Sequence, residues 1–209
     1  MQIIPPSFKI VSPYDSDYAI DMCKDIERTA RTCYKTEDKI TDDSYLTFLQ
    51  MLINKKHHAM IEHSMMSVRF ICDRGVTHEM VRHRLCAFAQ ESTRYCNYTK
   101  GKFGGHITLI HPEGLTENQL ARREEHFEAV QRLYEAEIAE GLSPNIARGV
   151  LPTCLKTEIV VTANWREWRH IFNMRTPMTA HPQMRQLMRP LLVEARELIP
   201  IVFDDITME

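Results

Sequence analysis

The sequence lacks the dense cysteine framework of a small secreted domain. Its 209 residues contain six cysteines, scattered along the chain with no Cys-x-x-Cys pair, whereas a disulfide scaffold would place them closer together in a shorter chain. The first residues show no charged stretch followed by an apolar run, so no signal peptide is expected. No stretch approaches the roughly 20 apolar residues that a membrane span needs. We therefore expect reduced thiols, a cytoplasmic location and no membrane association.

The sequence also lacks an excess of charge of either sign. Lys and Arg number 26 against 28 for Asp and Glu, which gives a formal net charge of -2. This balance argues against a protein that coats nucleic acid, so any basic site must be local. Hydrophobic residues make up 44% and charged residues 26%, as in ordinary globular proteins, and the length suits one domain.

Common nucleotide and metal motifs are missing as well. There is no Gly-x-Gly-x-x-Gly run, and the few glycines near residue 101 do not form a P-loop. His78-Glu79 begins like a zinc-protease motif, but Arg82 stands where the second histidine is needed. His83 comes one residue later and would point elsewhere on a helix. We therefore expect no metal site.

Hydrophobic periodicity predicts an α+β fold. Helices are expected over about 15–34, 43–55, 76–88, 116–141, 164–174 and 182–198, with a short one after Ser143-Pro144, and strands over 63–72, 106–111 and 155–163. Asp15 or Ser16 is expected to cap the first helix, and Thr116 with Gln119 forms a capping box. Pro190 should kink or break the last helix. Because strands and helices do not alternate regularly, a doubly wound parallel sheet is not expected.

The densest polar cluster lies between Glu79 and Arg94. It contains arginines at 82, 84 and 94 and the hydroxyls of Ser92 and Thr93, and arginine suits bidentate recognition of phosphate. Consecutive helical residues point about 100° apart, so residues 82–84 could not all face one ligand if they were helical. Either this triplet is a solvated face, or it serves two pockets or two subunits.

The segment from Arg82 to Ser92 resembles the signature of a known family. Arg82-His83-Arg84, followed after seven residues by Ser92, is the signature of flavin-dependent thymidylate synthases, the ThyX class. The resemblance extends over nearly the whole chain. Further matches, in the family's order, are Ala30 to Tyr34, His57, Glu62-His63, Thr93-Arg94-Tyr95, Arg148 before Leu151-Pro152, Asn164, Arg166, Arg175, His181 and Gln183.

The resemblance implies a fold, an assembly and an activity. It implies a single domain over residues 1–209, with a central, mostly antiparallel sheet flanked by helices. It also implies a homotetramer with flavin sites between subunits, and no nucleic-acid partner. The implied reaction is reductive methylation of dUMP to dTMP, with 5,10-methylenetetrahydrofolate as one-carbon donor and NAD(P)H as reductant through FAD.

The resemblance also assigns a substrate site. The residues implied for dUMP are Glu79, Arg82, Gln90, Glu91, Ser92, Thr93, Arg94, Arg148 and Arg175. Arg175 and Ser92 are the expected catalytic residues. A fixed cation at Arg175 would stabilise negative charge on the uracil ring and activate the attacking carbon, although Arg175 could instead be a cation at a helix end. No base is paired with Ser92 in the sequence, so a phosphate-binding or orienting role is favoured over a nucleophilic one.

The residues implied for FAD are His57, Arg82, His83, Arg84, Gln90, Asn164, Arg166 and His170. Simpler roles stay open for three of them: a helix cap for Asn164, a satisfied histidine at an interface for His170, and a core polar pair with Glu62 for His57. The sequence also departs from the family pattern. Cys33 stands where the family has Ser, Ala59 where some members have Ser or Thr, and His170 where the family has Asn. Gln90 stands where many members have Glu, and Glu79 where some have Gln.

Two other functions are compatible with the residues. One is a relative of the same fold that acts on a different pyrimidine or uses different one-carbon chemistry. The other is a nucleic-acid-binding module that uses the basic segment, which the near-neutral charge disfavours. Cys86, inside the signature, is expected to be a packed thiol rather than a nucleophile.

Overall fold

A computed structural model describes residues 1–111 and 113–209 of the chain. Two compact units make up the described chain. Unit 1 consists of residues 1–7, 70–82 and 89–159, and unit 2 consists of residues 8–69, 83–88 and 160–209. A single domain over the whole chain stays a prediction.

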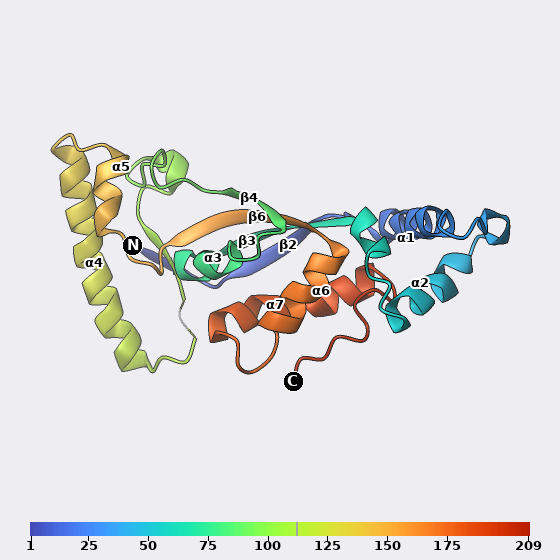
Figure 1. Cartoon of the computed structure of the whole chain (residues 1–209). Coiled ribbons are helices and arrows are strands. Elements are labelled where there is room, and N and C mark those ends of the chain that lie inside the picture. Colours follow the sequence, from blue (N-terminus) through green and yellow to red (C-terminus); the bar gives the residue numbers. More distant parts are fainter. Residues whose placement is uncertain (112) are drawn as a thin grey trace. The chain divides into compact units, whose positions relative to one another are not determined.

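The fold is α+β, as the sequence predicts, with an antiparallel sheet and flanking helices. Four strands form the main sheet in the order β2 (Ser7–Ser12), β3 (Met65–Asp73), β6 (Lys156–Asn164) and β4 (Cys86–Gln90) (Figure 1). In β3, alternate side chains from Met66 to Cys72 are buried, which is the pattern of a strand with one face on a core. The predicted strand over 63–72 is thereby confirmed.

Unit 1 contains a small parallel sheet and a long helix. Strands β1 (Gln2–Ile4) and β5 (Thr108–Ile110) pair in parallel. The helical elements are α3 (Arg74–Met80), η3 (Gly101–Phe103), α4 (Glu117–Ala139), α5 (Pro144–Ala147) and η4 (Arg148–Val150). The capping box predicted at Thr116 and Gln119 is present, and α5 packs beside α4 (Figure 1). The core of this unit is formed by Tyr98, Ile107, Leu109, Tyr134, Ala147 and Leu155.

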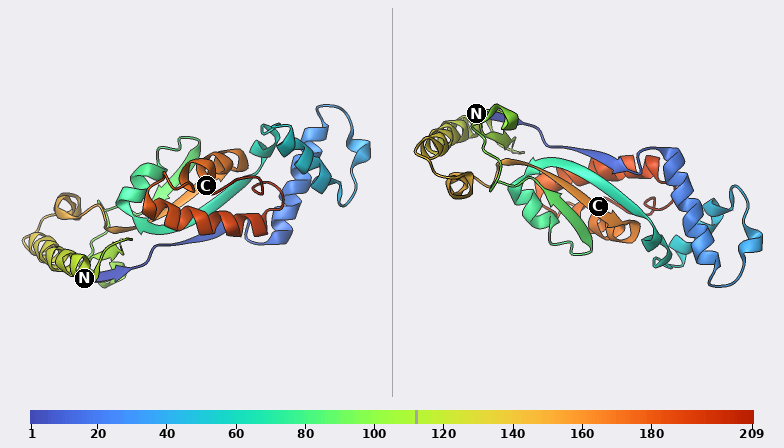
Figure 2. Two further views of the ribbon diagram at one scale, coloured as in Figure 1. Left: turned by 90° about the horizontal axis from the view of Figure 1, so that it is seen from below. Right: turned by 90° about the horizontal axis from the view of Figure 1, so that it is seen from above.

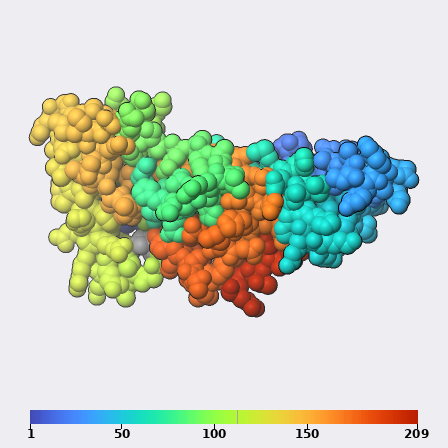
Figure 3. All heavy atoms as spheres, viewed as in Figure 1, coloured from blue at the N-terminus to red at the C-terminus, as the bar shows by residue number. Residues whose placement is uncertain are grey.

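Unit 2 contains two pairs of packed helices. Its elements are α1 (Ser16–Arg31), η1 (Glu37–Lys39), α2 (Ser44–Asn54), η2 (Met60–His63), α6 (Trp165–Arg175) and α7 (Pro182–Leu198). Helix α1 packs against α2, and α6 packs against α7 (Figure 2). Trp168 of α6 is fully buried, and its indole nitrogen donates a 2.8 Å hydrogen bond to the carbonyl of Met66 in β3. Segment η2 also contacts α6 (Figure 3), so α6 is fixed on several sides.

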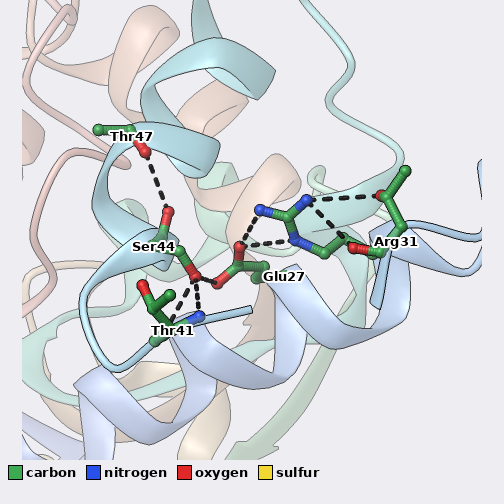
Figure 4. Close-up of polar contacts among 6 residues, drawn as sticks. Glu27, Arg31, Thr41, Ser44 and Thr47 are labelled. Carbon is green, nitrogen blue, oxygen red and sulfur yellow. Dashed lines mark hydrogen bonds and ion pairs between the residues drawn. The ribbon is translucent and has the colours of Figure 1, made fainter. Parts of the chain in front are cut away.

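A buried carboxylate joins α1 to the start of α2 (Figure 4). Glu27 is 1% exposed and accepts hydrogen bonds from Arg31 Nε and from Ser44 Oγ, each at 2.8 Å. The Arg31 guanidinium also reaches Thr36 and lies 4.6 Å from the centroid of the Phe48 ring. Both charges of this pair are therefore satisfied away from bulk water.

The structure corrects the prediction for the signature segment. The predicted helix over 76–88 is wrong after Met80: α3 ends there, residues 81–85 are not helical, and Cys86 begins strand β4. Arg82 and Arg84 lie in turns and His83 in an irregular position between them, so helical spacing does not apply to the triplet. Strands β1 and β2 were not predicted.

The last helix also differs from its prediction, because α7 continues through Pro190 to Leu198 without a break. Among the described residues, no helix is long and apolar enough to cross a membrane.

Candidate functional site

The predicted site residues form two groups, one in each unit. Unit 1 contains Glu79, Arg82, Gln90, Glu91, Ser92, Thr93, Arg94 and Arg148. Unit 2 contains His57, His83, Arg84, Asn164, Arg166, His170 and Arg175. The first group comprises most of the residues implied for the nucleotide, and the second comprises most of those implied for the flavin.

In unit 1, the turn that follows β4 presents hydroxyl and guanidinium groups together. The backbone N–H of Arg94 donates to Ser92 Oγ at 3.3 Å. Thr93 is 6% exposed, and its hydroxyl accepts a 3.2 Å hydrogen bond from Arg148 Nη1. Helical segment η4 thus places Arg148 beside Thr93, although the two residues are far apart in the sequence. Within the described residues, no base is bonded to the Ser92 hydroxyl.

The charges around this turn leave a local positive excess. The negative charge of Glu91 is balanced by Lys156. The Glu91 carboxylate accepts hydrogen bonds from Lys156 Nζ and from the Tyr98 hydroxyl, each at 2.7 Å. Arg94 and Arg148 are exposed, and neither forms an ion pair with a carboxylate among residues 1–111 and 113–209. Two guanidinium groups beside a hydroxyl suit a phosphate. Glu91 supports the turn rather than contributing charge to it.

Gln90, at the end of β4, points its amide nitrogen into the protein. Its Nε2 donates to the hydroxyls of Thr77 at 3.0 Å and Thr157 at 3.3 Å, and both threonines are fully buried. A glutamate here could only accept from those hydroxyls. Arg82 is exposed and Glu79 is half-buried, and the two are joined by a backbone hydrogen bond of 3.2 Å.

In unit 2, the start of α6 lines a cavity of about 520 Å³. Asn164 caps the helix, since its side chain accepts from the Glu167 backbone N–H at 2.8 Å, so the predicted cap is confirmed. Arg166 Nη1 lies 2.5 Å from Glu62 Oε1 at the surface. The cavity is lined by Glu62, Leu85, Asn164, Arg166, Glu167 and His170. Three of the residues implied for flavin therefore share one cavity.

His83 is the buried residue of the signature triplet. It is 6% exposed, whereas Arg84 is exposed. The Nε–H of Arg175 donates to His83 Nε2 at 3.0 Å, and Glu167 Oε1 lies 3.6 Å from His83 Nδ1 on the other side of the ring. Burial, followed by the charge of Arg175, lowers the pKa of His83 to about 4. His83 is therefore uncharged at neutral pH, and Glu167 meets a neutral imidazole.

His83, Glu167 and His170 each offer one potential metal-ligand atom, and these atoms lie within 4.8 Å of one another. Sequence reasoning missed this cluster because His83 is far along the chain from α6. The available signal was the spacing of Glu167 and His170, which are three residues apart and so share a helix face. Metal ligation by His83 Nδ1 would move its proton to Nε2, against the N–H of Arg175. The observed hydrogen bond thus disfavours a metal ion at this position.

A second cavity in unit 2, of about 430 Å³, lies at the ends of α1 and α2. His57, Cys33 and Ala59 line it together, although they are separated in the sequence. Arg31 and Phe48 line it as well. Figure 4 shows how Glu27 holds the Arg31 guanidinium, which also donates to Thr36. The two substitutions flagged from the sequence, Cys33 and Ala59, thus fall in one cavity with His57.

Cys86 is not an activated nucleophile. Burial, followed by the nearby carboxylate of Glu167, raises the pKa of its thiol to about 12. Because the thiolate is the reactive form, the group stays a protonated thiol at neutral pH. This agrees with the packed thiol expected from the sequence.

Comparison with known proteins identifies the family. Residues 17–201 match a family model described as "Thymidylate synthase complementing protein". A flavin-dependent thymidylate synthase of Corynebacterium aurimucosum is 31% identical over 196 residues, covering 86% of this chain and 78% of the relative. The chain belongs to the flavin-dependent thymidylate synthase family. A second member, from Geobacter sulfurreducens, is 27% identical over 185 residues, covering 84% of this chain and 78% of the relative.

Solved structures share the fold. A UMP/dUMP methylase PolB from Streptomyces cacaoi, bound with 5-Br dUMP, superposes with a TM-score of 0.79 at 19% identity. The superposition covers 98% of this chain and 96% of that one. Flavin-dependent thymidylate synthases are methyltransferases, and the chain is an enzyme of that class.

Proposed function

We propose that this enzyme methylates dUMP to dTMP, with 5,10-methylenetetrahydrofolate as the one-carbon donor and NAD(P)H as the reductant through FAD. The observation that carries the proposal is the turn after β4 in unit 1. There, Ser92, Arg94 and Arg148 come together with no carboxylate partner among the described residues. This group has the charge and the donors to hold the phosphate of a mononucleotide.

Ser92 has a positioning role in this proposal. Its hydroxyl already accepts from the Arg94 backbone N–H, which orders the turn. Because no base among the described residues is bonded to it, the hydroxyl is a weak nucleophile but a good donor to a phosphate oxygen. Thr93 supports the site by holding the Arg148 guanidinium.

Arg175 has the electrostatic role. A fixed guanidinium near the uracil carbonyls stabilises the negative charge that activates the ring carbon. The hydrogen bond from its Nε to His83 fixes the plane of the group. A guanidinium is the right choice for this task because it stays charged at any physiological pH.

The cavities of unit 2 fit a flavin nucleotide. Their volumes of about 520 and 430 Å³ lie in the usual range for cofactor sites. Asn164, Arg166 and His170 would hold polar parts of FAD in the first cavity, and His57 would contact it in the second. The pair of Arg166 with Glu62 is about half exposed, so exchanging Glu62 for a phosphate costs little. When bound, FAD supplies the electron transfer that the one-carbon unit needs to become a methyl group.

Two measurements test the proposal against its alternatives. Purified protein should carry bound flavin, with absorbance at about 450 nm, and should release tritium from the 5-position of labelled dUMP when folate and NADPH are present. Release from labelled UMP but not from dUMP would favour a relative with a different pyrimidine substrate. Salt-sensitive DNA binding by a protein that takes up no flavin would favour the nucleic-acid-binding alternative.

A further inference from the structure

Glu167 is a buried acid that the proposed function leaves without a role. It is 7% exposed, and desolvation by burial raises the pKa of its carboxyl, while the charge of His170 opposes that rise. Burying a carboxylate is unfavourable unless neighbouring groups compensate it. One of its titratable neighbours is His83, whose Nδ1 lies 3.6 Å from the Glu167 carboxylate. Glu167 therefore faces the histidine of the signature.

His83 in turn contacts Arg175. Its Nε2 accepts the 3.0 Å hydrogen bond from Arg175 Nε, so Nε2 must carry a lone pair and the ring proton must be on Nδ1. That proton then points toward the Glu167 carboxylate. The 3.6 Å separation is slightly longer than a hydrogen bond, and at this range an oxygen that can only accept still favours the Nδ1–H form over the alternative tautomer. Both neighbours of the ring thus select the same tautomer.

We infer that Glu167, acting through His83, positions the guanidinium of Arg175. The inference rests on the proposed function, in which Arg175 stabilises charge on the pyrimidine. If His83 changed tautomer, Nε2 would present a hydrogen to the Nε–H of Arg175, and two donors would face each other. The guanidinium would then turn away, and a small displacement of a positioned cation costs about 100-fold in rate. Glu167 is therefore a positioning residue. His83 orients the Arg175 guanidinium, in addition to any contact that it makes with flavin.

A simpler role for Glu167 must be separated from this one. It lies in the first turn of α6, where any acid stabilises the helix dipole by about 0.3–1 kcal/mol. Glu167→Gln and Glu167→Ala both remove this charge, and both keep the backbone N–H that Asn164 caps. They differ in one respect: glutamine retains an oxygen that can accept from His83 Nδ1, and alanine does not. A helix-dipole role predicts the same result for both variants.

The first test compares turnover in these two variants. We expect Glu167→Ala to lower kcat by about 10-fold to 100-fold with little change in KM for dUMP, and Glu167→Gln to recover most of the loss. Asp205→Asn is the matched control, because Asp205 forms a bidentate pair with buried Arg169 of the same helix, at 2.6 and 2.7 Å. It should lower the melting temperature and leave kcat unchanged. Equal losses in both Glu167 variants would overturn the inference.

The second test does not depend on activity. In protein labelled with ¹⁵N-histidine, the His83 signal, assigned by its loss in His83→Gln, should report the Nδ1–H tautomer. It should shift toward the other tautomer in Glu167→Ala and stay in place in Glu167→Gln. An unchanged tautomer in Glu167→Ala would overturn the inference even in an active enzyme. If neither the wild type nor any variant makes dTMP but the tautomer shifts as stated, the proposed function fails. The coupling of Glu167, His83 and Arg175 then still stands.

A metal ion is the competing occupant of this cluster. Addition of Zn²⁺ should leave the Nδ1–H signal of His83 unchanged, because ligation would require loss of that proton. Its disappearance on addition of Zn²⁺ would show that His83, Glu167 and His170 form a cation site and would overturn the positioning role.

Discussion

At the scale of single residues, the account depends on a few guanidinium groups whose partners differ. Arg31 and Arg169 are bound to buried or nearby carboxylates and serve the fold. Arg94 and Arg148 have no such carboxylate among the described residues, and Arg148 is positioned by a threonine hydroxyl instead. An arginine that a hydroxyl orients keeps its full charge for a ligand. This difference separates structural arginines from candidate binding arginines in this chain.

Arg148→Ala should weaken nucleotide binding without unfolding the protein. Loss of one charge-assisted contact to phosphate costs about 1.5–3 kcal/mol, so KM for dUMP should rise about 10-fold to 100-fold. Arg132→Ala is the control, since Arg132 lies on α4 in an exposed pair with Glu128, and its KM should match the wild type. Steady-state kinetics in both variants provide the measurement. An unchanged KM in Arg148→Ala would remove Arg148 from the site.

The neutral state of His83 predicts a pH dependence of stability. Arg175, Glu167 and His170 surround the ring, and its pKa of about 4 in the folded protein is below the usual 6.5. The unfolded chain therefore binds the proton at higher pH than the folded one does. The free energy of unfolding should thus rise with pH between about 4 and 6.5 and reach its full value above that range, a contribution of roughly 3 kcal/mol.

Urea unfolding of wild type and His83→Gln at pH 5 and pH 7.5 measures this contribution. The wild type should lose more stability at pH 5 than the variant does. Equal losses in the two proteins would show that His83 does not titrate as stated.

At the scale of elements, the sequence predicted those helices and strands whose signals are local. Helix α1 with its Asp15 cap, α4 with its capping box, and α6 with Asn164 as cap all agree with their predictions. Strand β4 was missed because Cys86–Gln90 continues the apolar spacing of the preceding helix, and its strand state depends on its place beside β6. Residues distant in the chain decide that pairing, so a local reading could not find it.

The candidate site shows the same division. The signature and the arginines could be found from the sequence through the family resemblance. Their partners could not, because Thr93 meets Arg148, Gln90 meets Thr157, and His83 meets Glu167 only in the fold. Glu91 was predicted to bind substrate, and its contacts with Lys156 and Tyr98 became apparent only in the structure.

The pair of Glu27 and Arg31 predicts a large stability effect at the junction of α1 and α2. Glu27→Ala would leave Arg31, whose side chain is 11% exposed, without its carboxylate, and breaking a buried pair from one side costs about 3–5 kcal/mol. Asp25→Ala on the same helix removes the exposed partner of Arg28 and should cost less than about 1 kcal/mol. Urea unfolding of both variants measures the contrast. Equal effects would show that Glu27 does not stabilise this junction.

At the scale of the whole molecule, family and fold are established and the assembly stays a prediction. The family match covers most of the chain, and a solved structure of 19% identity shares the fold. Light scattering should give a mass of four chains of 24.5 kDa each, with flavin absorbance in the same peak. A monomer that retains flavin through gel filtration would contradict flavin sites shared between subunits.

The most direct test of the central claim is dTMP formation by the purified enzyme, followed by mass spectrometry. The complete mixture of dUMP, methylenetetrahydrofolate and NADPH with the flavin-loaded enzyme should yield dTMP and tetrahydrofolate. Omission of any one of the three, or use of enzyme stripped of its flavin, should abolish the product. Arg175→Ala should form dTMP far more slowly while keeping the wild-type melting temperature. Formation of dTMP without flavin, or undiminished turnover in Arg175→Ala, would contradict the account.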